Sequence, residues 1–495
     1  MTRQQQRRKI LQTLYEMQAR DGLKALNCEE LASKMGLSWD EIRLEVAYLE
    51  EKDYIVLKKR QIRTRIFCTV YLTAKGIDWL ESDISKEKVT KTPSVLIPFK
   101  LQLNLRSDRT FEVRALETPL GEPHATSRLP YTVNELAAIL KALRMPKYEA
   151  SRFTQEQTHI LVQLGLLNHS HFVPDLPKLI GQALYKVLMN GDIHTAFQMA
   201  LNQARLADGS VSVQLRFDED AVKLVLYPWE LLYQRRALLS SRAVELTRYI
   251  SYPEAVTALP VIPLLRLLYI ASRPTNLSTL PAESEQLIIQ QALQKLQEEN
   301  VIKVDILVQP TYEALLDYLE THEVHILHFD GHGVFARKCI ECESMNYPHS
   351  THCAVCKQEI LKIEPQGYLA FENTTRCVHW ISSETLGTVL YNRSLSLAVL
   401  SACWSSSIGG ETLFGGIAPA LIQAGIPGIV SMQLPISVDG AIKFMQGFYR
   451  ALARFESIPA SVNAGRIRMM NSREWFIPTL YLRSRDNEGN LFTEK

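Results

Sequence analysis

Short apolar runs alternate with helical segments through the C-terminal half of the chain. The intervals between the runs include 283–297 and 312–319, where apolar residues recur at helical spacing. Strands that are apolar throughout are typical of a parallel sheet that is covered by helices on both faces. The sequence therefore predicts an α/β fold with a doubly wound, mostly parallel sheet. The predicted strands are 264–271, 301–308, 324–329, 397–400 and 428–432.

A histidine and a cysteine follow two of these runs. His332 lies beyond the third run, in His328-Phe-Asp-Gly-His-Gly333, and Cys403 lies beyond the fourth, in Leu400-Ser-Ala-Cys403. In an open parallel sheet, functional groups collect beyond the carboxyl ends of the strands. A histidine that takes the proton of a neighbouring cysteine turns that cysteine into a nucleophile. We therefore expect a cysteine hydrolase with His332 and Cys403 as its dyad, and Asp330 as either a third member or a turn residue.

The spacing between the two residues supports this interpretation. Caspases carry a Gln-Ala-Cys motif with a histidine about 50 residues upstream of the cysteine. Here the gap is 403 − 332 = 71 residues, and it contains an apparent insertion at 336–358. Without the roughly 23 residues of this insertion, the gap returns to about 50 residues.

Four motifs, in this order along the chain, resemble the CHAT domain, a caspase-like peptidase family. They are Leu224-Val-Leu-Tyr-Pro-Trp-Glu-Leu-Leu-Tyr233, His328-Phe-Asp-Gly-His-Gly333, Leu400-Ser-Ala-Cys403 and Gly425-Ile-Pro-Gly-Ile-Val-Ser-Met-Gln433. The resemblance runs from about Pro98 to the C-terminus. It implies a caspase-like fold and a Cys/His endopeptidase that cleaves a protein substrate, in signalling or in bacterial defence. It also implies that the backbone N–H groups of Gly333 and Cys403 hold the oxyanion.

The same resemblance implies a substrate pocket beside the segment that follows Gly428. Met432, Gln433 and Asp439 lie there. An acidic Asp439 facing the pocket would favour a basic P1 residue, but the same residue also fits the start of the helix that follows.

Two Cys-x-x-Cys pairs lie in the insertion, Cys339 with Cys342 and Cys353 with Cys356, and ten residues separate the pairs. Four thiolates at this spacing fit a tetrahedral Zn²⁺, although the usual spacer is about 15–20 residues. His349 or His352 is an alternative to one of the cysteines. Because four protein ligands leave no open position on zinc, the predicted metal is structural.

The first of these cysteines follows His332 by 339 − 332 = 7 residues. We therefore expect a small zinc-ribbon insertion that projects near the active-site cleft. It is either a stabilised surface loop or a site that binds substrate or an activator protein.

Residues 1–82 show the pattern of a winged helix-turn-helix. Apolar residues recur at helical spacing in 10–17, Asn27 and Ser38 suit the starts of two further helices, and 54–71 forms a basic hairpin. The third helix is acidic, which disfavours contact with DNA phosphates. We therefore favour an adaptor that binds an activator protein, with DNA binding as the alternative.

Composition sets the remaining bounds. The net charge is +2 and no apolar run reaches the length of a membrane span. The polar N-terminus lacks the apolar core of a signal peptide, so we expect a cytoplasmic protein without a membrane partner. In a reducing compartment, Cys-x-x-Cys pairs indicate metal or redox chemistry and not structural disulfides.

The predicted domain organisation joins these parts. The boundaries are 1–82 for the winged helix, 83–98 for a linker, 99–260 for the N-terminal, non-catalytic part of the CHAT region, and 261–495 for the catalytic part. Within the non-catalytic part, 222–227 is a predicted strand. The predicted function is a regulated cysteine endopeptidase; the alternative is a DNA-binding regulator or adaptor with a catalytically inactive caspase-like scaffold.

Overall fold

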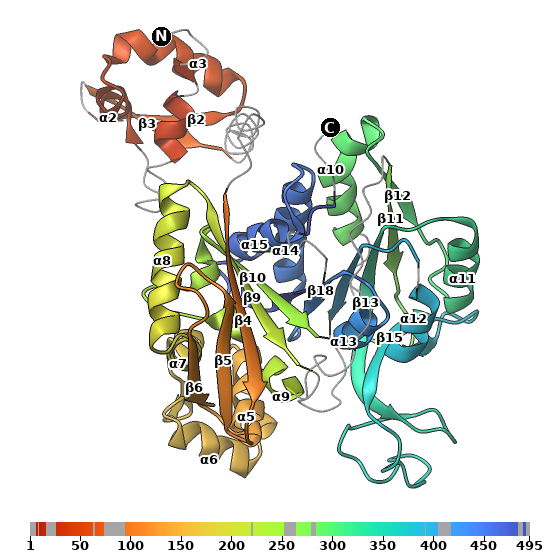
Figure 1. The fold of residues 1–495 in the computed structure, drawn as a ribbon. Helices are drawn as coiled ribbons and strands as arrows, with labels where there is room; N and C mark the ends of the chain where they lie inside the picture. Colours follow the sequence, from red (N-terminus) through yellow and green to blue (C-terminus); the bar gives the residue numbers. More distant parts are fainter. Residues whose placement is uncertain are drawn as a thin grey trace. The chain divides into compact units, whose positions relative to one another are not determined.

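The computed structural model describes the chain in two compact units, Met1–Ser94 and Val95–Lys495 (Figure 1). The described residues are 6–7, 9–15, 26–62, 65–73, 95–218, 221–251, 264–278, 284–391, 393–403, 417–483 and 489–491. Within these ranges, no helix combines the length and the apolar character needed to cross a bilayer.

In the first unit, the helical residues 9–15, two further helices and a three-stranded sheet surround a small apolar core. Asn27 begins α2 by accepting a hydrogen bond from the N–H of Glu29, and Ser38 and Glu41 form a capping box at the start of α3. Both helix starts are as predicted. Residues 74–82, the last part of the predicted winged helix, fall outside the described residues. The elements are α2 (Cys28–Lys34) and α3 (Trp39–Glu51), with the strands β1 (Leu26–Asn27), β2 (Ile55–Ile62) and β3 (Arg65–Leu72) in the order β1-β3-β2.

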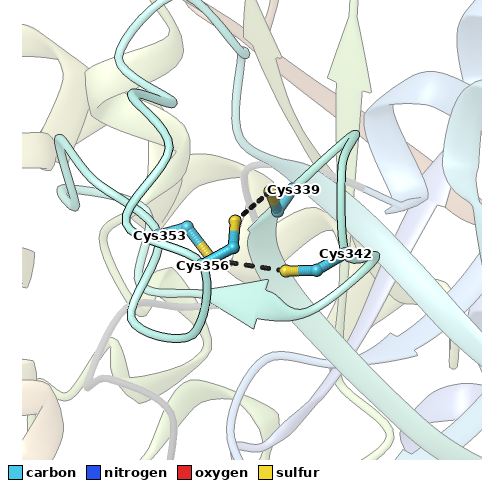
Figure 2. A group of neighbouring side chains, drawn as sticks. All are labelled: Cys339, Cys342, Cys353 and Cys356. Atoms are coloured by element: carbon cyan, nitrogen blue, oxygen red, sulfur yellow. Dashed lines mark hydrogen bonds between the residues drawn. The ribbon is translucent and has the colours of Figure 1, made fainter.

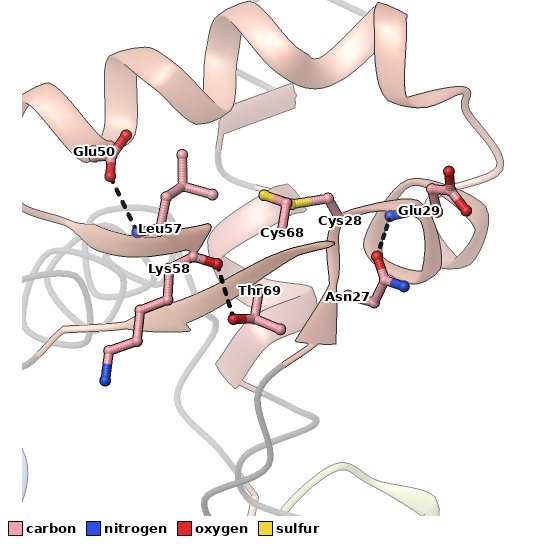
Figure 3. Close-up of a disulfide and its surroundings, with 8 residues drawn as sticks. All are labelled: Asn27, Cys28, Glu29, Glu50, Leu57, Lys58, Cys68 and Thr69. Atoms are coloured by element: carbon pink, nitrogen blue, oxygen red, sulfur yellow. Dashed lines mark hydrogen bonds between the residues drawn. A yellow bond between two sulfur atoms is a disulfide. The ribbon is translucent and has the colours of Figure 1, made fainter. Parts of the chain in front are cut away.

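A disulfide between Cys28 and Cys68 joins α2 to β3 (Figure 3). The sequence did not predict this bond, because the expected compartment is a reducing one. The two cysteines are 40 residues apart in the chain. Closing a loop of this length stabilises a fold by about 4 kcal/mol in the chain-entropy model. The stability of the first unit therefore depends on the redox state around it.

A single mixed sheet runs through the second unit. Its strand order is β12-β11-β13-β17-β18-β19-β10-β9-β4-β5-β6. Along this path the pairs β18–β19, β4–β5 and β5–β6 are antiparallel and the others are parallel, so the prediction of a mostly parallel α/β sheet is confirmed. The strands are β4 (Leu96–Leu105), β5 (Thr110–Glu117), β6 (His124–Arg128), β9 (Ser210–Phe217), β10 (Val244–Ile250), β11 (Leu265–Ala271), β12 (Ile302–Ile306), β13 (Ile326–Lys338), β17 (Leu397–Cys403), β18 (Gly428–Met432) and β19 (Pro478–Leu482).

Helices lie between these strands. Among them, α10 and α11 form where the apolar spacing predicts them, whereas α8, α9 and α15 were not predicted as helices. The helices are α5 (Val133–Arg144), α6 (Gln155–Gln163), α7 (Leu176–Leu188), α8 (Asp192–Leu206), α9 (Val222–Val225), α10 (Ser284–Glu298), α11 (Tyr312–Thr321), α12 (Ser383–Leu390), α13 (Ile417–Gln423), α14 (Val438–Leu452) and α15 (Ile458–Arg468).

The strand β19 unites the two halves of the sheet. It lies between β18, from the predicted catalytic part, and β10, from the predicted non-catalytic part. The sequence analysis did not predict β19. The strands β4, β5, β6, β9 and β10 are therefore part of the same sheet as β13 and β17, which carry His332 and Cys403.

A buried ion pair lies close to this junction. Arg248 on β10 donates from Nε and Nη2 to the carboxylate of Glu230, and both side chains are at most 1% exposed. Gln433, which follows β18, donates to the same carboxylate at 3.0 Å. The guanidinium of Arg466 on α15 lies 4.0 Å from it. One carboxylate thus balances two buried arginines.

The same arginine explains an incorrect strand prediction at 222–227. This segment forms the short helix α9 and a turn. Arg248 donates to the backbone carbonyls of Val225 and Tyr227, at 2.6 and 3.1 Å. Two carbonyls that converge on one guanidinium require a turned backbone and not an extended one.

Burial gives the stability of the second unit an expected pH dependence through Glu245 on β10. Its carboxylate accepts from Ser210 at 3.3 Å, and its Oε2 atom lacks a partner among the described residues. Burial raises the pKa of Glu245 from 4.5 to about 7. A raised acid pKa stabilises the folded state below the unfolded pKa, and this stability is lost as the pH rises through the folded pKa. We expect a loss of up to about 3 kcal/mol in the free energy of unfolding.

Urea unfolding of wild type and Glu245→Gln measures this loss, from below the ordinary pKa of 4.5 to above the raised pKa of about 7. The free energy of unfolding of wild type should fall relative to that of Glu245→Gln as the pH rises from 4.5 to about 7, and the difference should then level off. Parallel pH profiles would contradict the expectation.

Candidate active site

The long strand β13 places His332 beside Cys403. It pairs in parallel with β17 from Ile326↔Leu397 to His332↔Cys403, and from Gly333 onward it pairs antiparallel with β15 (Gln366–Glu372) (Figure 1). Neighbouring strands lie about 4.8 Å apart, so the two backbones are adjacent. The expectation that His332 lies past the end of its strand is wrong, because pairing with β15 extends β13 to Lys338.

The imidazole of His332 contacts a backbone carbonyl. The ring is 2% exposed, and Nε2 lies 2.9 Å from the carbonyl oxygen of Ser278. A carbonyl only accepts hydrogen bonds, so the proton of the neutral ring is on Nε2 and the lone pair is on Nδ1. The carbonyl of Ser278 therefore orients the ring, and Nδ1 is the nitrogen that can take up a proton.

Ser278 belongs to the segment 272–278, which follows β11 and is held on its neighbours. Arg273 donates from Nη1 to the carbonyl of Asp330 at 2.7 Å and from Nη2 to the carboxylate of Asp330 at 2.5 Å. The N–H of Arg273 donates to Glu372 on β15 at 2.8 Å. Tyr269 also donates to the Asp330 carboxylate, at 2.6 Å. Asp330 thus anchors the segment that orients His332.

A second buried network joins β13 and β17 upstream of His332 and Cys403. The carboxylate of Glu285, on α10, accepts from Ser401 at 2.8 Å and lies 3.1 Å from Nε2 of His328. The other ring nitrogen of His328 lies 2.7 Å from the hydroxyl of Tyr449 on α14. Burial raises the pKa of Glu285, whereas its contacts with His328 and Ser401 oppose this shift. The network fixes β17 two residues before Cys403 and β13 four residues before His332.

The three residues predicted beside a substrate pocket have different surroundings. Met432 and Gln433 are each 2% exposed, and Gln433 donates to Glu230 and to the carbonyl of Phe476. Asp439 is exposed in the first turn of α14 and pairs with Lys443, while Ser437 caps that helix. Gln433 therefore has a structural role in this conformation, and a role for any of the three in substrate selection stays a prediction.

The four cysteines of the insertion converge on one point (Figure 2). The sulfur atoms of Cys339, Cys342, Cys353 and Cys356 all lie within 4.8 Å of one another, and the Cys339–Cys356 and Cys342–Cys353 pairs are 3.5 Å apart. A tetrahedral ion with bonds of about 2.3 Å places its sulfur ligands about 3.8 Å apart. These four thiols therefore fit a metal ion, and we name them the cysteine cluster.

Neighbouring residues shape the cysteine cluster. Arg337 at the end of β13 donates to the carbonyls of Pro348, Ile360, Leu361 and Ile363, and so ties the loop around the cluster to the strand. The side chains of the two nearby histidines have other neighbours. His349 stacks on Tyr347, and His352 contacts Thr351.

The strand also sets the separation between the cysteine cluster and the dyad. Cys339 directly follows β13, and six residue steps separate His332 from the last residue of that strand, Lys338. At about 3.3 Å per residue, these steps span about 20 Å. The cluster therefore lies beyond the reach of a direct contact with His332.

Comparisons with known proteins give one family and a larger set of similar solved structures, three of which follow. A family model described as "CHAT domain" matches residues 178–481. A search of curated proteins finds no match. The structure is similar to that of the Saccharomyces cerevisiae separase–securin complex, with a TM-score of 0.38, 12% identity and coverage of 83% of this chain and 31% of that chain. This chain thus spans about a third of the separase chain.

The other two structures are of gingipains. The Arg-specific cysteine proteinase gingipain R (RGPB) gives a TM-score of 0.36 and 9% identity, over 65% of this chain and 75% of that chain. The complex of Porphyromonas gingivalis RgpB pro- and mature domains gives a TM-score of 0.35 and 11% identity, over 64% of this chain and 77% of that chain.

Proposed function

Because the chain belongs to the CHAT domain family, we propose that it is a regulated cysteine endopeptidase of the caspase-like type, with His332 and Cys403 as its dyad. The observation that carries the proposal is the register of the two central strands, in which these residues are partners at the end of the parallel ladder. The proposed setting is a signalling or bacterial defence pathway in the cytoplasm, in which the enzyme cleaves a specific protein partner.

The proposed reaction proceeds through an acyl-enzyme. Nδ1 of His332 takes the thiol proton of Cys403, and the thiolate attacks the carbonyl carbon of the scissile bond. The N–H groups of Gly333 and Cys403 stabilise the resulting oxyanion. His332 then gives its proton to the leaving amine, and water hydrolyses the thioester. The Ser278 carbonyl stabilises the ring while it carries both protons.

Peptidase profiling on a proteome-derived peptide library tests this proposal. Wild type should cleave a subset of peptides, and Cys403→Ala should cleave none of them. The residues around the cleaved bonds then give the P1 preference. Cleavage that persists in Cys403→Ala would exclude the dyad. Cleavage by neither protein would favour the alternative, a regulator with an inactive caspase-like scaffold.

For the first unit we propose a winged-helix adaptor that binds an activator protein. The outer face of α3 carries the exposed acids Asp40 and Glu41 beside Leu44, which is 69% exposed. An acidic and apolar surface suits a basic, apolar protein segment better than DNA phosphates. Titration with duplex DNA distinguishes the protein-binding adaptor from the DNA-binding alternative. Tight binding that weakens steeply with salt would support the DNA-binding alternative.

For the cysteine cluster we propose a structural Zn²⁺ that shapes a binding site for substrate or activator. The metal would be held by Cys339, Cys342, Cys353 and Cys356 and would supply folding energy, since all four positions are protein ligands. Three side chains around the cluster are apolar and exposed, which suits a protein partner: Ile340 (77%), Val355 (68%) and Leu361 (52%).

Chelation is expected to disorder the insertion, because small zinc folds are unfolded without metal. Limited proteolysis should then cut within 336–358, and cleavage of a protein substrate should fall. Elemental analysis of purified wild type and Cys342→Ser is the control, and it should find zinc in the first protein and less in the second. Full activity on the protein substrate after chelation would contradict the binding role.

A further inference from the structure

A cavity of about 420 Å³ lies at the base of the cysteine cluster, and we name it the base pocket. This volume is within the usual range of ligand sites, about 300–1,000 Å³. The pocket is built from three separate parts of the chain: the segment 272–278, the hairpin at the end of β13, and the edge strand β16 (Val378–Ser382). Its lining residues are Leu277, Lys338, Glu343, Ser344, Met345, Val378, His379 and Trp380.

The walls and floor of the base pocket suit an apolar group. Met345 and Trp380 pack on a small core of Val334, Ala336 and Tyr368, which is separate from the main core of the unit. At the rim, Lys338 pairs with Glu343 at 3.2 Å. The charges of this pair offset one another, so the pocket offers little net charge to a ligand. An aliphatic or aromatic side chain would bury its surface there at low electrostatic cost.

The base pocket shares a wall with the candidate active site. Leu277 lines the pocket, and the next residue is Ser278, whose carbonyl contacts His332 at 2.9 Å. Lys338, another lining residue, is six residues beyond His332 on β13, a span of about 20 Å. An extended peptide advances about 3.3–3.6 Å per residue. A peptide held at the dyad therefore reaches the base pocket about two to five residues from its scissile bond.

The segment between the two sites is anchored at several points. The N–H of Thr275 donates to the carbonyl of Arg376 at 2.8 Å, and Asn276 accepts from the N–H of Val378 at 2.8 Å. With Arg273 held by Asp330, the whole segment is fixed on β13 and on the β15–β16 hairpin. A group bound against Leu277 thus has a fixed position relative to His332.

From this geometry we propose that the base pocket is a substrate subsite, which takes an aliphatic or aromatic side chain of the protein substrate. The proposal rests on the proposed peptidase function and adds a specificity determinant to it. Trp380, Met345 and Leu277 are the specificity-determining residues, and the subsite selects substrates at a position about two to five residues away from the bond that is cut.

The test compares peptides and variants in a double-mutant cycle. A cleaved peptide with an apolar residue at the favoured position is paired with the same peptide carrying alanine there. Wild type should prefer the apolar peptide in kcat/KM by about 10- to 200-fold. Trp380→Ala and Met345→Ala should each lower this preference at least about tenfold. The loss in kcat/KM caused by the protein substitution and the loss caused by alanine in the peptide should not be additive. Leu206→Ala, on the exposed face of α8 at 84% exposure, is the matched control.

A binding measurement makes the result independent of turnover. In the Cys403→Ala background, the same two peptides should bind with different affinities, and Trp380→Ala should remove the difference. Melting temperatures of all variants establish that they are folded.

The possible outcomes distinguish a failure of the subsite proposal from a failure of the proposed peptidase function. If wild type cleaves peptides but shows no apolar preference at these positions, or if Trp380→Ala keeps the full preference, the subsite is overturned while the peptidase stands. If wild type cleaves no peptide and Cys403→Ala binds none, both the subsite and the proposed peptidase function are overturned. If the variants impair only the binding of an activator or of a second copy of the chain, the pocket is not a substrate subsite.

Discussion

Replacing His332 by alanine is expected to lower kcat/KM for peptide cleavage by at least about 1,000-fold. The variant loses the group that takes the proton of Cys403 and later protonates the leaving amine. The ring is buried, and its contact with the carbonyl of Ser278 fixes its orientation. Steady-state kinetics on the best peptide from the library measure the loss.

His159→Ala is the matched control, because His159 is exposed on α6. It should leave kcat/KM within about twofold of wild type. A His332→Ala protein that retains wild-type turnover would remove this histidine from the mechanism. Equal losses in both variants would point to a folding defect, which the melting temperature would reveal.

Replacing Glu230 by alanine is expected to cost about 3–5 kcal/mol of the free energy of unfolding. The carboxylate balances Arg248, which is fully buried, and Arg466, which is 1% exposed. Removing it leaves two guanidinium groups without a countercharge in a site that water does not reach. Burial lowers the pKa of Arg466 to about 10 although Glu230 opposes this shift, and the same carboxylate raises the pKa of Arg248 against the effect of burial. Chemical denaturation followed by circular dichroism measures the change.

Glu122→Ala provides the comparison, since Glu122 pairs with Arg114 on the surface and both side chains are more than half exposed. It should change the free energy of unfolding by less than about 1 kcal/mol. The loss in free energy of unfolding for Glu230→Gln should lie between the losses for Glu230→Ala and Glu122→Ala. The amide keeps the volume of the side chain and part of its hydrogen bonding but loses the charge. A loss for Glu230→Ala no larger than that of Glu122→Ala would show that the buried cluster contributes little.

Local patterns in the sequence predicted the parts of the fold that depend on neighbours in the chain. The apolar runs indicated the parallel strands, and the capping residues indicated the starts of α2 and α3. The spacing of four cysteines predicted the cysteine cluster, because a tetrahedral ion constrains both the residue type and its separation. The adjacency of His332 and Cys403 followed from their places beyond two predicted strands.

Features that depend on distant partners were missed. β19 is a five-residue strand that begins with proline, and its two neighbours lie far away in the sequence. One partner of His332 is the backbone carbonyl of Ser278. Every residue type carries such a carbonyl, so the side chain at position 278 offered no signal. Glu285 looks like an exposed residue in the first turn of a helix; the one available signal was His328, a polar ring inside an apolar run that requires a buried partner.

The place of β19 has a consequence for the order in which the protein can mature on the ribosome. β10 and β18 emerge first, and each then presents an edge with unpaired backbone groups that invite association with other chains. These edges are covered only after residues 478–482 have left the exit tunnel and inserted between them. A nascent chain that already contains His332 and Cys403 is therefore still an open sheet until β19 has been synthesised.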